Sequence, residues 1–223
     1  MPYVAPSTVV AGQTYGAAAH NVIVNDVVDH ESRIVTATNQ SVRVFTNETA
    51  RDAAITSPSE GMMAFLTAST VTTAAGDETA IPSGIVTIYN GTKWITVTPV
   101  GAQTFSTGTT TSGGFTATLS GSPGTNPSVT LATGTGVIVS YSAFMNVSGG
   151  NTGVCNFAVS GATTRAAVEQ ESVYTFNNLN AGFGRTTIIG NLTAGTNTFT
   201  LQYRTSGGTA TFASRHISVT PIQ

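Results

Sequence analysis

The 223-residue chain is short of charge: only 8% of its residues are charged, and 8 basic against 10 acidic side chains give a formal net charge of −2 at pH 7. No run of Lys or Arg could neutralise a row of phosphates, so we expect no binding to nucleic acid. No stretch approaches the roughly 20 apolar residues that span a bilayer, so we expect no membrane insertion. The N-terminal residues lack the layout of a secretory signal, which predicts a protein that is made and used without export.

Residues 1–34 predict an extended arm followed by a helix that anchors the chain to a partner. Pro2 and Pro6 disfavour a helical start, whereas the segment from about Tyr15 to Ile34 contains no Pro and predicts a helix. A Val-rich helix of this length is not stable alone in water, so it must dock on another protein or on its own copies. The predicted anchoring residues lie in the arm and along one stripe of the helix: Tyr3, Pro6, His20, Ile23, Val27, His30 and Ile34.

Residues 35–98 predict a small α+β module. The runs SVRVF and GMMAFL are typical of short strands, and ETARDAAI between them is typical of a single helical segment. Asn47 or Thr49 can cap that helix, and the acidic residues near its start suit the positive end of the helix dipole. A loop is expected over residues 67–83, which contain Gly and Pro.

The run IVTIYNGTKWITV predicts a β-hairpin, because the dipeptide Asn90-Gly91 accepts the positive φ angles of a type I′ turn. Residues 99–112 are rich in Gly, Ser and Thr and predict a linker. From residue 113 to residue 223 about eight alternating runs recur between Gly-rich turns, which predicts an antiparallel β-sandwich of the jelly-roll type. The predicted fold class is therefore mainly β.

One face of the longest predicted strand carries six residues: Val137, Val139, Tyr141, Ala143, Met145 and Val147. Ile138 and Phe144 fall on the opposite face, which predicts that both faces of this strand are covered. Cys155 lies in an alternating run and is expected to be a buried, structural thiol. Sheet edges without Lys or Glu invite pairing with other chains, so we expect an oligomer and favour a homotrimer.

Two stretches, RDAAITSPSEGMMAF and IYNGTKWI, resemble a pattern of minor tail and fibre-like proteins of actinobacterial tailed bacteriophages. That pattern is Arg-Asp-Ala-Ala-Ile, then Pro-x-x-Gly, then Tyr-x-Gly-x-x-Trp. The matching positions are Arg51 to Ile55, Pro58, Gly61, Tyr89, Gly91 and Trp94. The arm and helix also resemble the openings of phage virion proteins, and the last strands are similar to those of jelly-roll heads on phage fibres. The resemblance implies a structural role in the virion, generally as a trimer, and it carries no catalytic residues.

The chain has few residues that could form a catalytic or metal-binding site. His20, His30 and His216 are ten or more residues apart, so no metal-ligand pair exists at helical spacing and we expect no metal and no cofactor. A ring of symmetry-related His20 and His30 side chains on the helix seam is a less favoured alternative. The predicted sandwich contains no Asp, so no Ser-His-Asp set can be assembled there. We therefore expect no enzymatic activity.

Four charged residues of the sandwich are candidates for surface binding: Glu169, Glu171, Arg204 and Arg215. On a strand, Glu169 and Glu171 would point the same way, as paired carboxylates do. A solvated patch or an ion pair with Arg165 or Arg185 is the favoured interpretation of these two residues. The two candidate arginines flank a Gly-Gly turn, where they could bind a sugar or a carboxylate at an exposed tip.

The sequence therefore predicts a virion structural protein that is assembled in the host bacterial cytoplasm. We expect a tail-associated fibre or appendage whose N-terminal arm and helix attach to other virion proteins and whose sandwich contacts a host cell-surface glycan. One alternative is a head fibre or capsid decoration protein. A second is a depolymerase that cleaves host polysaccharide through Glu169 or Glu171, and a third is a cell-surface adhesin domain.

Overall fold

The computed structural model describes Asn25, residues 27–30 and residues 42–222. The chain divides into two units, Met1–Ser41 and Val42–Gln223. In the first unit Asn25 and residues 27–30 are helical, and Val27 is 52% exposed in the single chain. None of the described helices is long and apolar enough to span a membrane. His30, a second predicted anchoring residue, is also exposed on this helical segment. The remaining predicted anchoring residues lie outside the described residues: Tyr3, Pro6, His20, Ile23 and Ile34.

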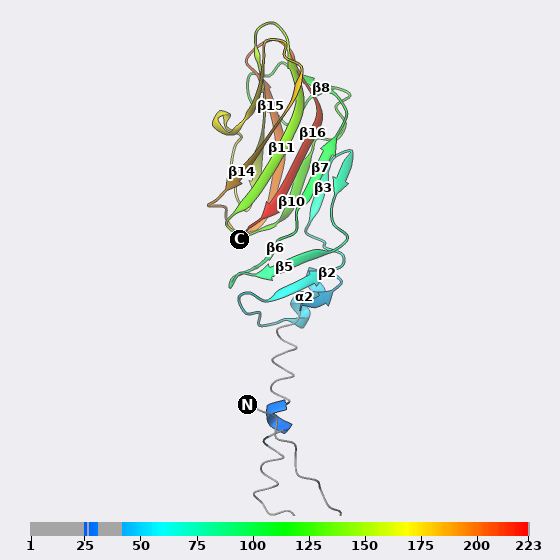
Figure 1. Cartoon of the computed structure of the whole chain (residues 1–223), viewed down its shortest axis with the longest axis vertical. Coiled ribbons are helices and arrows are strands. Elements are labelled where there is room, and N and C mark those ends of the chain that lie inside the picture. The colour runs from blue at the N-terminus through cyan, green and yellow to red at the C-terminus, as the bar shows by residue number, and fades with distance from the viewer. Residues whose placement is uncertain (1–24, 26, 31–41, 223) are drawn as a thin grey trace, which may run out of the picture. The chain divides into compact units, whose positions relative to one another are not determined.

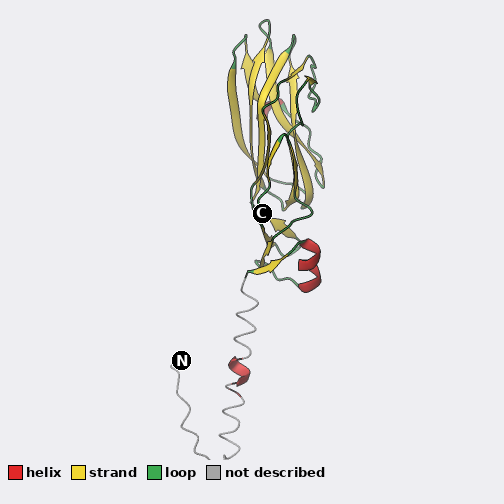
Figure 2. Ribbon diagram, turned by 90° about the vertical axis from the view of Figure 1, so that its right-hand side faces the viewer, coloured by secondary structure: helices red, strands yellow, loops and turns green. Residues whose placement is uncertain are grey.

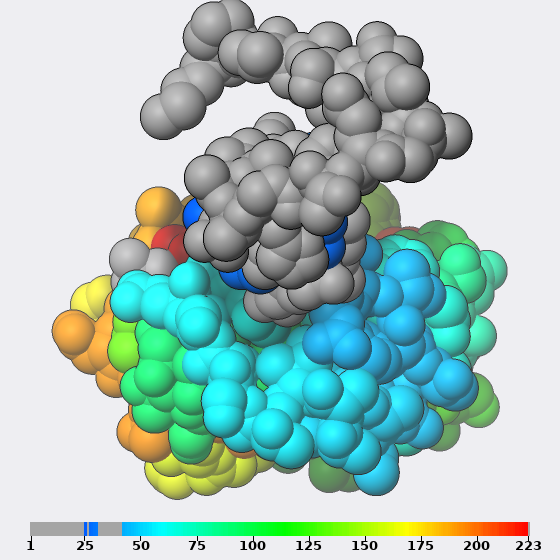
Figure 3. Space-filling view, turned by 90° about the horizontal axis from the view of Figure 1, so that it is seen from below, coloured from blue at the N-terminus to red at the C-terminus, as the bar shows by residue number. Residues whose placement is uncertain are grey.

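The second unit begins with the predicted small α+β module (Figures 1 and 2). Its sheet has the order β1-β2-β5-β6; β1 runs parallel to β2, and the other neighbours are antiparallel. Figure 3 looks at this module from below and shows β1, the helix and β2 in blue to cyan. The elements are β1 (Arg43–Phe45), α2 (Glu48–Ala54), β2 (Met63–Leu66), β5 (Ile85–Tyr89) and β6 (Trp94–Thr96).

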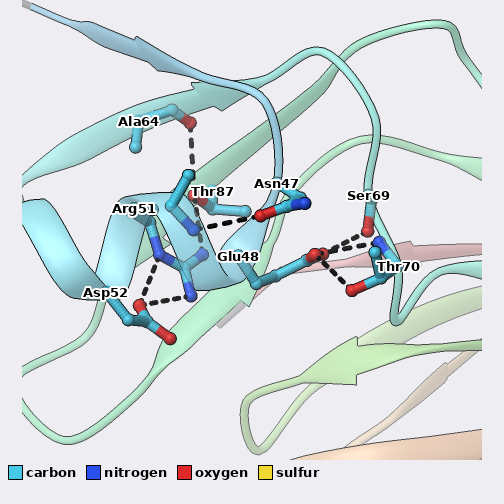
Figure 4. A network of polar contacts seen from close by, with 9 residues as sticks. Asn47, Glu48, Arg51, Asp52, Ala64, Ser69, Thr70 and Thr87 are labelled. Carbon is cyan, nitrogen blue, oxygen red and sulfur yellow. Dashed lines mark hydrogen bonds and ion pairs between the residues drawn. The ribbon is translucent and has the colours of Figure 1, made fainter.

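Side chains at the start of helix α2 cap the helix and connect it to the loop that follows β2 (Figure 4). Asn47, one of the two predicted capping residues, accepts a hydrogen bond of 3.0 Å from the amide of Ala50. The Glu48 carboxylate accepts hydrogen bonds from the Ser69 hydroxyl and from the amide and hydroxyl of Thr70. Burial favours the neutral acid, but these hydrogen bonds outweigh it and hold the pKa of Glu48 below its usual value.

Three of the positions that carry the resemblance to phage tail proteins, Arg51, Tyr89 and Trp94, lie together in this module. The guanidinium carbon of Arg51 lies 4.6 Å from the ring centroid of Trp94, and Tyr89 packs edge-on against the same ring at 5.6 Å. Arg51 is only 4% exposed, donates to the Thr87 hydroxyl over 3.4 Å and pairs with Asp52 at 2.8 Å (Figure 4). A buried guanidinium with these partners fixes helix and hairpin against each other.

The predicted hairpin is present, but its turn is one residue further along the chain than expected. The amide of Asn90 donates to the carbonyl of Lys93 over 3.0 Å, so the two central turn residues are Gly91 and Thr92. Of the described residues in this turn, only Gly91 has a positive φ, of 88°, as in a type II′ turn. The Asn90 side chain accepts from the amides of Thr92 and Lys93 instead, which stabilises the turn without left-handed backbone at Asn90.

Two antiparallel sheets form the predicted sandwich, shown face-on in Figure 1 and edge-on in Figure 2. The five-stranded sheet has the order β13 (Val173–Phe176), β12 (Thr152–Gly161), β15 (Gly195–Thr205), β10 (Ser128–Thr133) and β3 (Thr73–Ala75). The other, seven-stranded sheet has the order β14 (Ala181–Ile189), β11 (Val137–Val147), β16 (Ala210–Pro221), β7 (Val100–Thr104) and β4 (Glu78–Ala80). Its remaining strands are β8 (Gly108–Thr110), which pairs with β16, and β9 (Ser120–Gly121), which pairs with β8.

The core lies between these two sheets and follows the predicted alternation. The six predicted inward residues of β11 are all buried, and they face aromatic and aliphatic side chains such as Phe157 and Phe199. Cys155 is fully buried there, and burial raises the pKa of its thiol to about 12. The expectation that both faces of β11 are covered is wrong at Phe144, which is 40% exposed on the outer face.

Two segments for which the sequence predicts no strand belong to the sandwich. The predicted loop 67–83 contributes β3 to one sheet and β4 to the other, and the predicted linker 99–112 contains β7 and β8. These strands have three to five residues, mostly Thr, Ala, Gly and Gln, and carry weak strand signals of their own. β3 pairs with β10, β7 and β8 pair with β16, and β4 pairs with β7. These partners satisfy their backbone groups, so tertiary context decides their conformation.

Because β3 and β4 connect the small module to both sheets, we predict that module and sandwich unfold together. Trp94 and Cys155 are the only Trp and Cys of the chain and lie one in each part. In a denaturant titration, Trp94 emission and the reactivity of the Cys155 thiol should change at the same midpoint. Two separated midpoints would contradict this expectation, and a Cys155→Ser variant controls for labelling elsewhere.

Removal of the buried guanidinium at the centre of the small module should destabilise the fold. We predict that Arg51→Met lowers the free energy of unfolding by about 1–3 kcal/mol, because a cation–π contact and hydrogen bonds to Thr87 and Asp52 are lost. Arg43→Met is the matched control, since Arg43 lies over the Phe45 ring at 5.2 Å but is partly exposed. It should cost less than about 1 kcal/mol. Equal losses in urea denaturation would show that Arg51 has no special role.

Candidate functional site

Polar and small residues line up across the outer face of the seven-stranded sheet. Five strands, β14, β11, β16, β7 and β4, each contribute one residue to a first row of cross-strand partners. In that order the residues are Gly184, Ser142, His216, Gln103 and Glu78. The adjacent second row is Thr186, Ser140, Ser218, Gly101 and Ala80. With strands spaced about 4.8 Å apart, five strands make each row roughly 19 Å long. We call these two rows the cross-strand track; its strands β14, β11, β16 and β7 lie side by side in Figure 1.

The track forms because the strands that build the core have polar residues at the alternate positions. Tyr141 and Ala143 of β11 are buried in the core, so Ser140 and Ser142 face outward. On β16 the buried residue Ile217 separates two outward residues, His216 and Ser218, in the same way. The apolar inner face thus fixes the position of each polar side chain on the outer face.

The track is hollowed at the end where β14, β11 and β16 lie. A shallow, open depression of about 240 Å³ is lined by Ser140, Tyr141, Ser142, Gly184, Arg185, Thr186 and His216. Gly184 helps to keep it open: a Cβ at this position would lie 3.2 Å from the Cβ of Ser142 and 3.3 Å from the Tyr141 carbonyl oxygen. Such an open hollow suits one part of an extended ligand that lies across the sheet better than it suits a small molecule that must be enclosed.

The track offers hydrogen-bonding groups of both kinds. The hydroxyls of Ser140 and Thr186 lie 2.8 Å apart, and the Gln103 amide donates to the Glu78 carboxylate over 2.7 Å. No hydrogen bond among the described residues involves the imidazole of His216, which is half-buried between them. Burial lowers the pKa of His216, so at neutral pH the ring is uncharged and has one donor and one acceptor nitrogen.

The lowered pKa of His216 predicts a contribution to the pH dependence of stability. Because the unfolded chain takes up this proton at a higher pH than the folded protein does, the stability that depends on the neutral ring is lost as the pH falls below about 6.5. We predict that His216→Gln reduces the loss in free energy of unfolding between about pH 7.5 and pH 5. Urea denaturation at both pH values measures this loss. An equal loss in the variant and the parent protein would contradict the prediction.

The structure places Glu169 and Glu171 on a short 3-10 helix, η1 (Glu169–Glu171), and not on a strand. Glu171 pairs with Arg165, the interaction that the sequence favours, and Glu169 pairs with Arg204. The three carbonyl oxygens of η1 accept hydrogen bonds from side chains of three different strands. Tyr174 donates to the carbonyl of Glu169, Arg185 to that of Gln170, and Tyr141 to that of Glu171. These charged residues therefore fasten the segment that carries η1 to the edges of both sheets.

Arg215 is not at an exposed tip, which corrects the expectation from the sequence. It is 0% exposed and donates to the carbonyl of Pro123 and to the Tyr203 hydroxyl over 3.3 Å. The β-bulge between positions 142 and 144 of β11 shifts the register of β16, so Arg215 points into the sandwich. The Asp77 carboxylate accepts hydrogen bonds from the Thr104 hydroxyl, the Thr125 amide and the Ser106 hydroxyl. These hydrogen bonds, of which that from Thr104 has the largest effect, hold the pKa of Asp77 below its usual value.

The structure also identifies a group that the sequence interpretation passed over. From the sequence, His216 is only a lone imidazole without a metal partner, and nothing there singles out its hydroxyl-bearing neighbours Ser142 and Ser140. Alternation along β11 and β16 could have shown that these side chains face outward. Within the described parts of the chain, no group of three or more His, Cys, Asp or Glu residues is placed to hold a metal ion.

No protein-family model matches the chain, and no curated protein does. Three solved structures are similar at low identity. A family 61 carbohydrate-binding module in complex with β-1,4-galactotriose is 11% identical, with a TM-score of 0.24, over 66% of this chain and 81% of that chain. A xylan-binding module of family 15 is 15% identical, with a TM-score of 0.23, over 73% of this chain and 98% of that chain.

The third structure is the enzymatically active domain of tailspike protein 4 of bacteriophage CBA120. It is 10% identical, with a TM-score of 0.23, over 71% of this chain. The match spans only 19% of that longer chain. At these TM-scores the three likenesses carry no argument about function.

Proposed function

We propose that this chain is a non-enzymatic structural protein of a tailed-phage particle, an oligomeric appendage that contacts glycans of the host surface. Residues 1–34 attach it to other virion proteins, and a homotrimer is the assembly that the sequence favours. The virion part of the proposal is supported by the resemblance to phage tail proteins. Of its positions, Arg51 and Tyr89 both pack against the Trp94 ring in the small module, which gives the motif a structural reason.

The cross-strand track is the observation that supports glycan binding. It combines hydroxyl, amide and imidazole groups on a hollowed face; Glu78 is the only charged residue of its two rows, and Arg185 also lines the hollow. These groups match the hydroxyls of a neutral polysaccharide, which can lie along the roughly 19 Å length of the rows. An open site of this kind binds weakly, but many copies on one particle add up to firm attachment.

The proposed absence of catalysis is supported by the state of the two candidate carboxylates. Glu169 and Glu171 are each engaged in an ion pair with a different Arg. Their backbone oxygens hold η1 to the sheets, which assigns this segment a structural role. The residues Glu169 and Glu171 are also absent from the lining of the depression in the track.

Filling the track should weaken glycan binding without unfolding the protein. We predict that the protein, when many copies are displayed together on a bead, binds at least one neutral member of a panel of neutral and acidic polysaccharides. Ser142→Phe should weaken that binding at least tenfold, because the added ring occupies the depression between Gly184 and His216. Thr200→Phe is the matched control, since Thr200 lies on the outer face of the five-stranded sheet opposite Ser128 and Ala158.

Binding to immobilised polysaccharide, measured for both variants at equal thermal stability, checks this prediction. The control should stay within about twofold of the parent protein. If no polysaccharide binds, or if the two variants lose binding equally, the track is not a glycan site.

A further inference from the structure

Edge strand β13 carries two aromatic side chains on the outer face of the five-stranded sheet. Val173 and Thr175 are buried in the sandwich, so the alternate residues Tyr174 and Phe176 face outward. Their rings are parallel to within 10°, with centroids 6.1 Å apart. Phe176 is 53% exposed. Apolar ring surface exposed to water in this way gains free energy when a ligand covers it.

A hydrogen-bonding pair lies beside these rings. The Tyr174 hydroxyl donates to the carbonyl of Glu169, and the Glu169 carboxylate pairs through Oε1 with Arg204. Tyr174 and Arg204 are both cross-strand neighbours of Val154, so they lie on the same outer face. The Glu169 side chain is 49% exposed, and its Oε2 accepts no hydrogen bond from any described residue. The pair is neutral as a whole but offers a free acceptor oxygen.

The backbone next to Phe176 is held rigidly. Asn177 and Asn178 have φ angles of 52° and 62°, and the amide of Leu179 donates to the carbonyl of Phe176 over 2.9 Å, as in a type I′ turn. The Asn146 side chain donates to the carbonyl of Asn178 over 3.2 Å, which ties this turn to β11. Phe176 is therefore presented by a preorganised turn, which reduces the entropy lost on binding.

We propose that Tyr174, Phe176, Glu169 and Arg204 form a second saccharide contact, separate from the cross-strand track. It takes a neutral pyranose ring that has one apolar face and equatorial hydroxyls at its rim, as β-linked glucose and N-acetylglucosamine have. The apolar face of the sugar covers Phe176, and a hydroxyl donates to Oε2 of Glu169. This inference extends the proposed function, because it assigns a second region to the same class of ligand.

The test is titration of the full chain with cellotetraose and with chitotetraose, followed by isothermal calorimetry and by saturation-transfer NMR. At least one of the two should bind, and saturation of the protein's aromatic protons should reach the protons on the apolar face of the sugar. Phe176→Ser should weaken binding about tenfold or more, because it removes the ring surface. Phe105→Ser removes a similarly exposed ring, 60% exposed just after β7 and outside the proposed contact, and should stay within about threefold of the parent protein.

Three outcomes overturn the inference: neither oligosaccharide binds, Phe176→Ser binds as well as the parent, or Phe176→Ser changes only the mass of the protein in light scattering. The last result would identify the aromatic pair as a protein interface. A parallel titration of Ser142→Phe separates the two proposals. If Ser142→Phe removes all binding and Phe176→Ser removes none, only the second contact is refuted. If no glycan binds under any condition, the proposed function fails as well.

Discussion

The pairing of β11 with β16 in the middle of the seven-stranded sheet is the constraint on which the rest of the structure depends. Ten residues of β11 between Val137 and Val147 each pair with a residue of β16, and the register shifts once, at a β-bulge. The inner faces of this pair supply much of the core, and the outer faces place Ser142 beside His216. Stability and the candidate binding surface thus come from the same two strands, because side chains alternate between the faces.

The sandwich has few charged side chains, and most of them are already engaged in contacts within the protein. Of the six charged residues between positions 113 and 223, five fasten η1 and its neighbours to the sheet edges, and the sixth, Arg215, is buried. Apart from Glu78 and the Glu169–Arg204 pair, the two candidate binding surfaces on the outer faces therefore have mainly hydroxyl, amide, imidazole and aromatic groups. A surface of this kind recognises neutral ligands by hydrogen bonds and stacking, because it has little charge with which to attract ions.

The elements that the sequence predicts correctly are those with strong local signals. The alternation of β11, the Asn47 cap of α2 and the hairpin around Gly91 each depend on a few neighbouring residues. The strands β3, β4 and β7 escape prediction because they are short and are stabilised by partners distant in the sequence. The track escapes for the same reason: alternation shows that Ser142 faces outward, but only the strand register shows that Gly184 and His216 lie beside it.

The most direct test of the account is an amide chemical-shift map of the chain, recorded by NMR while a fragment of a neutral polysaccharide is added. We predict that the largest shifts fall on the outward residues of the track, in β11, β14, β16 and β7, and that further shifts fall in η1 and β13, where the second saccharide contact lies. Shifts in β3, β10 and β12 should be smaller. Shifts confined to other strands, or no shifts at saturating fragment concentration, would contradict the claim that the outer face of the seven-stranded sheet binds glycan.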